Sequence, residues 1–180
     1  MNGNSNNKNV LQKSFYTFVN KFFIYMEITK RIAVFPGSFD PFTIGHKAIL
    51  DMALPLFDSI IVAIGSNSDK KDFFPIENRI NHISSIYANN TKVQIDTYTS
   101  LTIDFCKTKG ALFILRGLRN TTDFQFEKSI AQMNRQLSPN IETVFLVTPP
   151  EFGHVSSTIV RELIRYGADI SHYIPGTIER

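Results

Sequence analysis

The sequence predicts an α/β protein built on one parallel sheet, and three observations support this prediction. From Arg31 onward, short apolar runs typical of buried strands alternate with longer segments that have a helical period. Polar loops rich in Gly and Ser follow these runs, and the chain has no internal repeat. Because a strand, a helical crossover and the next strand form a parallel pair, five such runs predict a five-stranded parallel sheet.

The strands are expected at five apolar runs, residues 32–35, 59–64, 92–96, 111–115 and 143–147. The second run is continuously apolar, as a central strand buried on both faces should be. Helices are expected over 44–57, 75–87, 101–108 and 122–137 and from Ser156 onward, and a short helical tail is expected at the end. In the fourth helix, Phe126, Ile130, Met133 and Leu137 keep the helical period. The expected fold is a Rossmann-like, doubly wound five-stranded parallel sheet with helices on both faces.

The composition is that of one globular domain. The chain has 180 residues, of which 43% are hydrophobic and 19% charged, and this length can bury a sizeable core. No stretch approaches the roughly 18 apolar residues that a membrane span needs. Its one cysteine, Cys106, cannot form an intrachain disulfide and is expected to pack as a small hydrophobe in a helix. A lone cysteine favours a reducing compartment, so a cytoplasmic location is expected.

The net charge of +3 is unevenly distributed. Residues 1–25 hold three of the 19 basic residues and none of the 16 acids, so the rest of the chain is neutral. A neutral body argues against a nucleic-acid-binding surface. Residues 1–29 are Asn-rich and then aromatic, and we expect a disordered extension or a mis-assigned start, with Met26 as the natural start. Residues 30–180 are expected to form a single domain.

Residues 31–46 contain the most informative motif, a strand that breaks into a Gly/Ser loop and then opens a helix. This geometry binds phosphate, because loop N–H groups and the helix N-terminus point at the anion. Neither a P-loop nor a G-x-G-x-x-G fingerprint is present. What remains is G-S-F-D-P followed by T-I-G-H, which places His46 in the first helical turn. The alternative is that His46 is only a helix N-terminal residue and Gly45 a turn.

Polar loops also follow other expected strands, and all of them should lie at one edge of the sheet. In doubly wound sheets the ligand binds beyond the carboxyl ends of the strands. The loops after the first, second, fourth and fifth strands bring cations and hydroxyls to this rim: Ser38, His46, Lys70, Arg116, Arg119, Ser156 and Ser157. Such a rim is expected to bind an anion several phosphates long.

The T-I-G-H motif resembles the signature of the nucleotidyltransferase superfamily, which shares its fold with class I aminoacyl-tRNA synthetases. Segments between about residues 31 and 175 further resemble the phosphopantetheine adenylyltransferase family, in family order. They are P-G-S-F-D-P-F-T-I-G-H, S-D-K-K, I-L-R-G-L-R-N-T-T-D-F-Q-F-E, A-Q-M-N-R and V-S-S-T-I-V-R-E. R-G-L-R followed by D-F-x-F-E is the discriminating segment. The resemblance implies adenylyl transfer from ATP to 4′-phosphopantetheine, giving dephospho-coenzyme A and pyrophosphate by direct in-line attack.

The substrate's own phosphate is the nucleophile in this reaction, so the enzyme needs alignment and charge stabilisation rather than a base. His46, Lys70 and Ser38 are the expected catalytic residues. The resemblance places phosphopantetheine against Ser38, Lys70, Leu101, Thr102 and Arg116. It places ATP against a longer set: Ser38, Phe39, His46, Gly117, Leu118, Arg119, Glu127, Phe152, Val155, Ser156, Ser157 and Thr158, with Arg161 behind them.

Several of these residues could instead have a purely structural or surface role. Arg116 could form a salt bridge with Asp123, Lys70 could be a solvated surface residue, and Glu127 could be an ordinary helix surface residue. Ser156 could serve only as an N-cap, although capping and phosphate binding use the same geometry.

Departures from the family pattern affect the detail of the site rather than the reaction. Phe152 stands where Trp or Tyr often packs on adenine, and Thr102 follows Leu101 where a larger aliphatic residue is frequent.

The resemblance also implies Mg²⁺ carried with ATP, a homohexamer, and coenzyme A as a possible feedback inhibitor; no nucleic acid or membrane partner is expected. Two other functions remain open at this point. One is a nucleotidyltransferase of the same fold with a nicotinamide-mononucleotide or phospho-alcohol acceptor. The other is a non-catalytic nucleotide- or RNA-binding module.

Overall fold

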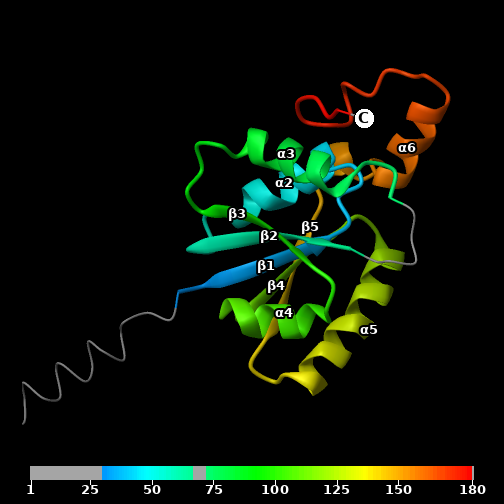
Figure 1. Ribbon diagram of the computed structural model, residues 1–180. Coiled ribbons are helices and arrows are strands. Elements are labelled where there is room, and N and C mark those ends of the chain that lie inside the picture. Colours follow the sequence, from blue (N-terminus) through cyan, green and yellow to red (C-terminus); the bar gives the residue numbers. More distant parts are fainter. Residues whose placement is uncertain (1–29, 67–71, 180) are drawn as a thin grey trace, which may run out of the picture. The chain divides into compact units, whose positions relative to one another are not determined.

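Five parallel strands form one sheet in the order β3-β2-β1-β4-β5 in the computed structural model, which describes residues 30–66 and 72–179 (Figure 1). The strands are β1 (Ile32–Gly37), β2 (Ser59–Gly65), β3 (Val93–Tyr98), β4 (Phe113–Leu118) and β5 (Glu142–Val147). All four pairings are parallel, which confirms the predicted fold class. β1 and β4 are neighbours although they are not consecutive, so the strand order reverses between them and creates the switch point where ligands bind.

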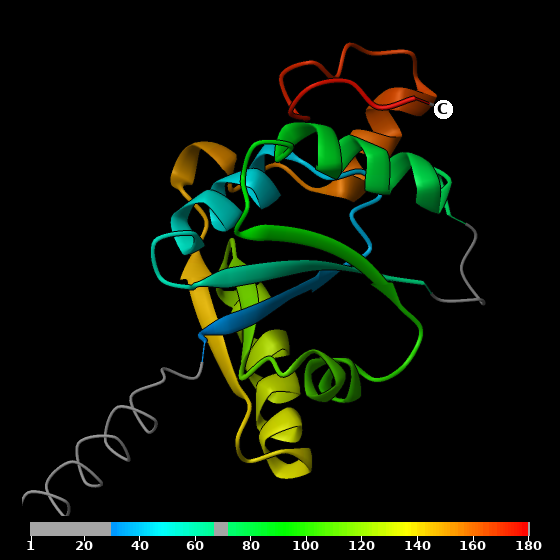
Figure 2. The same ribbon diagram turned by 60° about the vertical axis from the view of Figure 1, so that its left-hand side comes forward.

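Helices cover both faces of the sheet. α2 (Ile44–Ala53) and α3 (Ile76–Ile86) lie on one face, and α4 (Thr102–Lys109) and α5 (Thr121–Leu137) on the other (Figure 1 and Figure 2). A short 3₁₀ helix, η1 (Pro150–Phe152), and α6 (Ser157–Arg165) follow β5. The alternation of faces follows from right-handed crossovers, because the chain moves outward from β1 to β3 and then returns past β1 to β4.

Two buried hydrophobic clusters lie on opposite faces of the sheet. Side chains alternate along β1, so this strand contributes residues to both clusters. Ala33 and Phe35 belong to the cluster under α2 and α3, whereas Val34 belongs to the cluster under α4. Cys106 is buried in the second cluster, as predicted, and burial raises the pKa of its thiol to about 11. The chain from Arg31 onward forms one compact unit. The extension expected over residues 1–29 lies outside the described residues.

Several element boundaries differ from the prediction. α2 ends at Ala53 rather than at residue 57, because Pro55 has no N–H to continue the helical hydrogen bonds beyond the C-cap residue Leu54. β4 begins at Phe113 rather than at residue 111 and continues through Arg116 to Leu118. Parallel pairing of these residues with Phe145–Val147 extends β4 into a segment that is polar in sequence.

The C-terminal tail was expected to be helical, and this prediction is wrong. Residues 167–179 form turns and bends that are fixed by hydrogen bonds to the helices above the sheet. The Ile44 N–H donates to the Tyr173 carbonyl (3.0 Å), and His82 Nε2 donates to the Pro175 carbonyl (2.6 Å). Tertiary contacts therefore determine the conformation of this segment.

The fourth expected helix is present as α5, but its apolar positions are not in the core. Phe126, Met133 and Leu137 are more than half exposed, and Ile130 is 39% exposed. Glu127 is the buried residue of α5. The helical period therefore predicts the helix correctly, whereas this apolar stripe faces away from the core of the chain.

Candidate active site

Two cavities meet at the carboxyl ends of β1 and β4, the switch point of the sheet. The larger, of about 600 Å³, has a mainly apolar lining, and we call it the large cavity. The smaller, of about 370 Å³, has a mainly polar lining, and we call it the polar cavity. Five residues line both: Pro36, Gly37, Ser38, Arg116 and Glu127. Ligands bound in the two cavities would therefore meet at Ser38 and Arg116.

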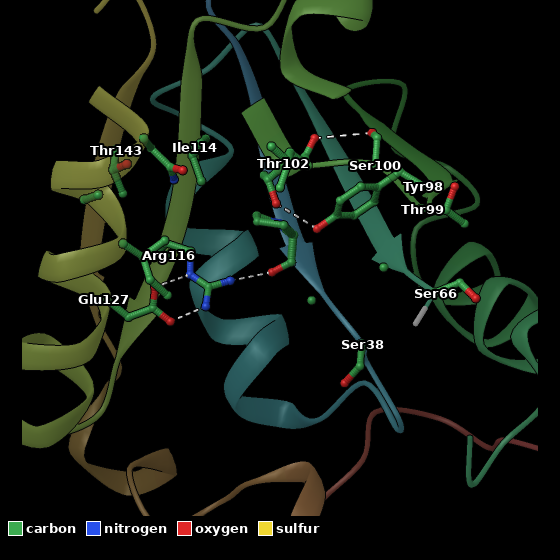
Figure 3. A pocket seen from close by; sticks show the side chains of 17 residues that line it. Ser38, Ser66, Tyr98, Thr99, Ser100, Thr102, Ile114, Arg116, Glu127 and Thr143 are labelled. Atoms are coloured by element: carbon green, nitrogen blue, oxygen red, sulfur yellow. Dashed lines mark hydrogen bonds and ion pairs between the residues drawn. The ribbon is translucent and has the colours of Figure 1, made fainter. Parts of the chain in front are cut away.

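The large cavity lies between the end of β3 and one side of α5 (Figure 3). Tyr98 contributes its hydroxyl, which is 3.0 Å from Thr102 Oγ1. Leu101 and Thr102, which the sequence predicts as substrate-binding residues, both line this cavity, and Ile130 and Asn134 line it from α5. The mixture of apolar surface and isolated hydroxyls suits a long ligand with few charges.

His46 lies in the polar cavity, and its protonation is fixed by the N-terminus of α2. The Thr43 N–H donates to His46 Nδ1 (3.0 Å), while the Thr43 hydroxyl accepts from the His46 backbone N–H in a capping box. Since an amide N–H can only donate, Nδ1 is the acceptor and the ring proton resides on Nε2. The imidazole packs against the rings of Phe42 and Phe39, with centroids 5.5 Å and 5.1 Å away.

The charge state of His46 follows from the same surroundings. Burial, and then the positive charges of Arg119 and Arg116, lower the pKa of His46 to about 4. The side chain is therefore neutral at pH 7 and presents one N–H donor, which suits contact with a phosphate oxygen. The alternative that His46 is only a helix N-terminal residue is incomplete, because its ring both caps the helix and lines the cavity.

Arg116 stands between the two cavities, and its guanidinium is held on two sides. Nε donates to Glu127 Oε2 (2.7 Å), Nη2 pairs with Glu127 Oε1, and Nη1 donates to the Pro36 carbonyl (2.7 Å) (Figure 3). The predicted alternative of an Arg116–Asp123 pair is wrong, since the partner is Glu127. Glu127 is only 9% exposed, so it is not a helix surface residue either.

Asp123 instead holds Arg119. Its carboxylate accepts from the Arg119 backbone N–H (3.1 Å), Nε (2.8 Å) and Nη2 (3.1 Å). Burial acts to raise the pKa of Asp123, but the hydrogen bonds and charge of Arg119 outweigh it and leave that pKa below its usual value. Both residues line the polar cavity, so the guanidinium is oriented there before any ligand binds.

The N-terminus of α6 closes the other side of the polar cavity. Ser156 caps this helix by accepting from the Ile159 N–H (3.2 Å), and the Ser157 hydroxyl donates to the Pro41 carbonyl (2.9 Å). Arg161 donates to the Asp40 carbonyl (2.6 Å) and to Thr158 Oγ1 (3.2 Å). Hydroxyls, a guanidinium and a helix N-terminus gathered in this way favour an anion.

The structure brings most of the predicted site residues to the two cavities. The polar cavity is lined by Ser38, Phe39, His46, Arg116, Gly117, Arg119, Glu127, Val155, Ser156, Ser157, Thr158 and Arg161. Leu118 and Phe152 line neither cavity: Leu118 is buried, and Phe152 packs beside Gly45 at the start of α2. Lys70 lies outside the described residues.

Gly117 has a packing role that the sequence does not reveal. A Cβ at this position would lie 2.8 Å from Ile49 Cγ1, closer than side-chain carbons can approach. The glycine of R-G-L-R therefore allows α2 to pack against β4, which brings His46 and Arg116 to the same end of the sheet.

Sequence reasoning missed Tyr98 and Arg79. A signal for Tyr98 was available, because the polar loop T-S at residues 99–100 follows β3 just as the other rim loops follow their strands. Arg79 carries no such signal, since an arginine in an amphipathic helix reads as a surface residue.

Comparison with known proteins agrees with this geometry. The cytidylyltransferase-like family model matches residues 34–163. Phosphopantetheine adenylyltransferase from Flavobacterium psychrophilum is 51% identical over 82% of this chain and 97% of the relative. The corresponding protein of Christiangramia forsetii is 49% identical over 82% and 97%. The chain belongs to the phosphopantetheine adenylyltransferase family. The predicted family and enzyme class, a nucleotidyltransferase, are therefore confirmed.

Solved structures with a similar arrangement of elements support the fold. A bifunctional NMN adenylyltransferase/ADP ribose pyrophosphatase from Francisella tularensis matches with a TM-score of 0.63, over 81% of this chain and 45% of that one. A nicotinic acid mononucleotide adenylyltransferase from Plasmodium falciparum matches with a TM-score of 0.57, over 81% and 90%. Both are 20% identical to this chain, so they establish the shared fold. Within residues 30–66 and 72–179, no helix has the length and apolar character required to span a membrane.

Proposed function

We propose that this protein transfers the adenylyl group of ATP to 4′-phosphopantetheine, as its family membership indicates. A phosphate oxygen of phosphopantetheine attacks the α-phosphorus of ATP, the bond from that phosphorus to the bridging α–β oxygen breaks, and pyrophosphate leaves. The products are dephospho-coenzyme A and pyrophosphate. The observation that supports this proposal best is that two cavities of different character share Ser38 and Arg116, where two substrates have to meet.

ATP is assigned to the polar cavity, because its donors match a triphosphate. The N-terminus of α6, with Ser156 and Thr158, is suited to the β- and γ-phosphates, and Arg119 adds a guanidinium already oriented by Asp123. Charge-assisted hydrogen bonds of this kind contribute about 1.5–3 kcal/mol each. The carboxylates of this cavity, Asp123 and Glu127, are both paired with arginines, so we treat Mg²⁺ as part of a MgATP substrate.

Phosphopantetheine is assigned to the large cavity. Its phosphate would lie at the shared end, next to Arg116, and its pantetheine arm would extend along Tyr98, Leu101 and Ile130. Glu127 keeps the guanidinium of Arg116 in a fixed orientation, which lowers the entropic cost of phosphate binding. Lys70 is proposed as a further contact to the attacking phosphate, on the basis of the family resemblance.

Catalysis is proposed to rest on positioning and charge stabilisation. The attacking phosphate is ionised near neutral pH, so no protein group has to remove a proton. His46 presents a neutral Nε2–H donor, fixed by Thr43, that can contact the α-phosphate as negative charge moves onto it. Ser38 lines both cavities and Phe39 lines the polar one, so we assign the Ser38 hydroxyl and the Phe39 N–H to bridging the two substrates.

Assembly and regulation are also proposed. The exposed apolar stripe of Phe126, Met133 and Leu137 on α5 supports a subunit interface, consistent with the homohexamer implied by the family resemblance. Coenzyme A carries both a pantetheine arm and an adenylyl group, so it fits the two joined cavities and is proposed as a feedback inhibitor. A cytoplasmic location is also proposed, because the buried free thiol of Cys106 suits a reducing compartment.

Pyrophosphate release tests the proposed function. The purified full-length protein is incubated with MgATP in four parallel reactions. Three of them contain one acceptor each (4′-phosphopantetheine, pantetheine or nicotinamide mononucleotide), and the fourth contains no acceptor. We expect release with 4′-phosphopantetheine and the appearance of dephospho-coenzyme A by mass spectrometry. Pantetheine is the matched control, because it has the same arm without the nucleophilic phosphate. Release with nicotinamide mononucleotide but not with 4′-phosphopantetheine would overturn the proposal.

A further inference from the structure

A fully buried arginine lies behind the candidate active site. Arg79, on α3, has a side-chain exposure of 0%, yet it lines neither the large nor the polar cavity. Burial of a charged group is costly unless the group is paired and hydrogen-bonded. The desolvation cost of the Arg79 guanidinium is therefore not explained by a contact with a ligand in either cavity. The partners of Arg79 indicate its role.

The guanidinium of Arg79 joins two loops at the rim of the sheet. Nη1 donates to the Ser38 carbonyl (2.8 Å), and Nη2 pairs with the carboxylate of Asp72. Within the described residues, Nε has no hydrogen-bond partner. Asp72 is 37% exposed and partly solvated, whereas the contact with Ser38 reaches the loop shared by both cavities. A lysine at this position would have one ammonium group in place of the planar guanidinium with its several N–H donors. It could not bond to the Ser38 carbonyl and to the Asp72 carboxylate in the same geometry.

The contact with the Ser38 carbonyl determines the direction of a neighbouring donor. The Ser38 carbonyl and the Phe39 N–H belong to one planar peptide group and point in opposite directions. Since the carbonyl points at Arg79 on α3, the Phe39 N–H points away from α3. Hydrogen bonding of a cation to the carbonyl also polarises the peptide, which makes its N–H a stronger donor.

Phe39 itself adopts a conformation that needs external support. Its φ is 47°, in the left-handed region that non-glycine residues rarely occupy. The Phe39 ring packs against Phe35, with centroids 5.3 Å apart, and against His46. The next residue, Asp40, accepts from the Phe73 and Phe74 N–H groups, at 2.9 Å each. The strained turn is therefore held by ring packing against Phe35 and His46 and by the hydrogen bond from Arg79 to the Ser38 carbonyl.

We propose that Arg79 is a positioning residue for adenylyl transfer, which orients and polarises the Ser38–Phe39 peptide so that the Phe39 N–H donates to the α-phosphate of ATP. The inference rests on the proposed function and adds to it a residue that touches neither substrate. The contact matters most when charge develops on the α-phosphate, so its loss lowers kcat more than it raises the KM for ATP. Small displacements of groups at the reacting centre can cost roughly a hundredfold in rate.

The two diastereomers of ATP bearing sulfur on the α-phosphate test this proposal. Sulfur accepts an amide hydrogen bond more weakly than oxygen does, so the wild-type enzyme should prefer the isomer that keeps oxygen toward Phe39. In Arg79→Lys, we expect kcat to fall roughly tenfold to a hundredfold, the KM for ATP to change less than about threefold, and the ratio of kcat/KM for the two isomers to move toward one. Arg79→Gln, a neutral single donor, should change this ratio in the same direction and provides a second variant if the lysine variant does not fold.

Asp72→Asn is the matched control, because it removes the other partner of Arg79 and leaves the contact with Ser38. We expect this variant to keep the wild-type isomer ratio within about twofold, with or without a change in melting temperature. A wild-type isomer ratio in folded Arg79→Lys or Arg79→Gln would overturn the inference and leave Arg79 a purely structural residue. Failure of the wild-type protein to form dephospho-coenzyme A would instead contradict the proposed function, so the two failures are distinguishable.

Discussion

The two cavities of the site achieve recognition by different means. In the polar cavity, each charged or ring group is already held: Thr43 fixes His46, and Asp123 fixes Arg119. In the large cavity, polar contacts are few, and the Tyr98–Thr102 hydrogen bond lies among apolar side chains. The difference indicates that preorganised donors are concentrated where charge changes during the reaction, and that apolar contact suffices where a chain only has to be held.

Removal of His46 should give the largest effect, because it lies where the chemistry takes place. We expect His46→Ala to lower kcat at least about a hundredfold while the Kd of ATP changes little, as loss of one preorganised donor usually does. Pyrophosphate release and ATP titration by calorimetry measure the two quantities. His46→Gln, whose amide can place an N–H near the position of Nε2, should recover part of the activity. Equal activity of His46→Ala and wild type would remove His46 from the mechanism.

Substitution of Arg119 should separate the two cavities in the kinetics. We expect Arg119→Met to raise the KM for ATP roughly tenfold to a hundredfold, because a charge-assisted contact contributes about 1.5–3 kcal/mol. The KM for phosphopantetheine should stay near the wild-type value. Asp123→Asn is the matched variant: it keeps Arg119 but weakens its orientation, so a smaller rise in the same constant is expected. An equal rise in both KM values would contradict the division into two cavities.

Substitution of Tyr98 is the corresponding test in the large cavity. Tyr98 lines the large cavity, and Tyr98→Phe removes its hydroxyl but keeps the ring, so loss of one hydrogen bond to phosphopantetheine, about 0.5–1.5 kcal/mol of binding free energy, is expected. This corresponds to a rise of a few-fold in the KM for phosphopantetheine, with the KM for ATP unchanged. Steady-state kinetics with either substrate varied measure both constants. A change confined to the KM for ATP would be evidence against the assignment of the large cavity.

The smallest expected effect is the change of kcat with pH. The lowered pKa of His46, about 4, keeps the imidazole neutral from pH 7 to 9, so kcat should vary less than about twofold through this group. The same shift makes folding stability fall as pH drops from about 6.5 toward 4, because the unfolded chain binds a proton that the native His46 does not. Rate measurements and melting temperatures across these ranges test both statements. A step in kcat near pH 7 that disappears in His46→Gln would show that His46 titrates there.

The sequence predicts the parts of this site that depend on local geometry. His46, Ser38 and Ser156 could be placed because loops that follow parallel strands share one edge of the sheet, and because a helix N-terminus presents its N–H groups there. The fixed ring of His46 was not predicted, because the second position of a capping box usually holds Glu or Gln, whereas here His46 occupies it and bonds to Thr43.

Features that depend on tertiary packing could not be predicted in this way. Arg79 is buried because α3 packs behind the Ser38 loop, and Glu127 pairs with Arg116 because α5 packs against β4. The period of α5 indicated a helix but not which of its apolar side chains the rest of the chain would cover. The tail follows the same rule, since its turns are set by contacts with α2 and α3.

The helix α5 belongs to two surfaces at once, and this has a consequence for measurements in dilute solution. Glu127 and Ile130 line the large cavity, whereas Phe126 and Met133 project from the same turns into solvent. A neighbouring subunit that covers those side chains would also hold the wall of the phosphopantetheine site. By mass action, dilution below the dissociation constant of the assembly should then weaken binding of phosphopantetheine before that of ATP. Specific activity at low phosphopantetheine should therefore fall with enzyme concentration.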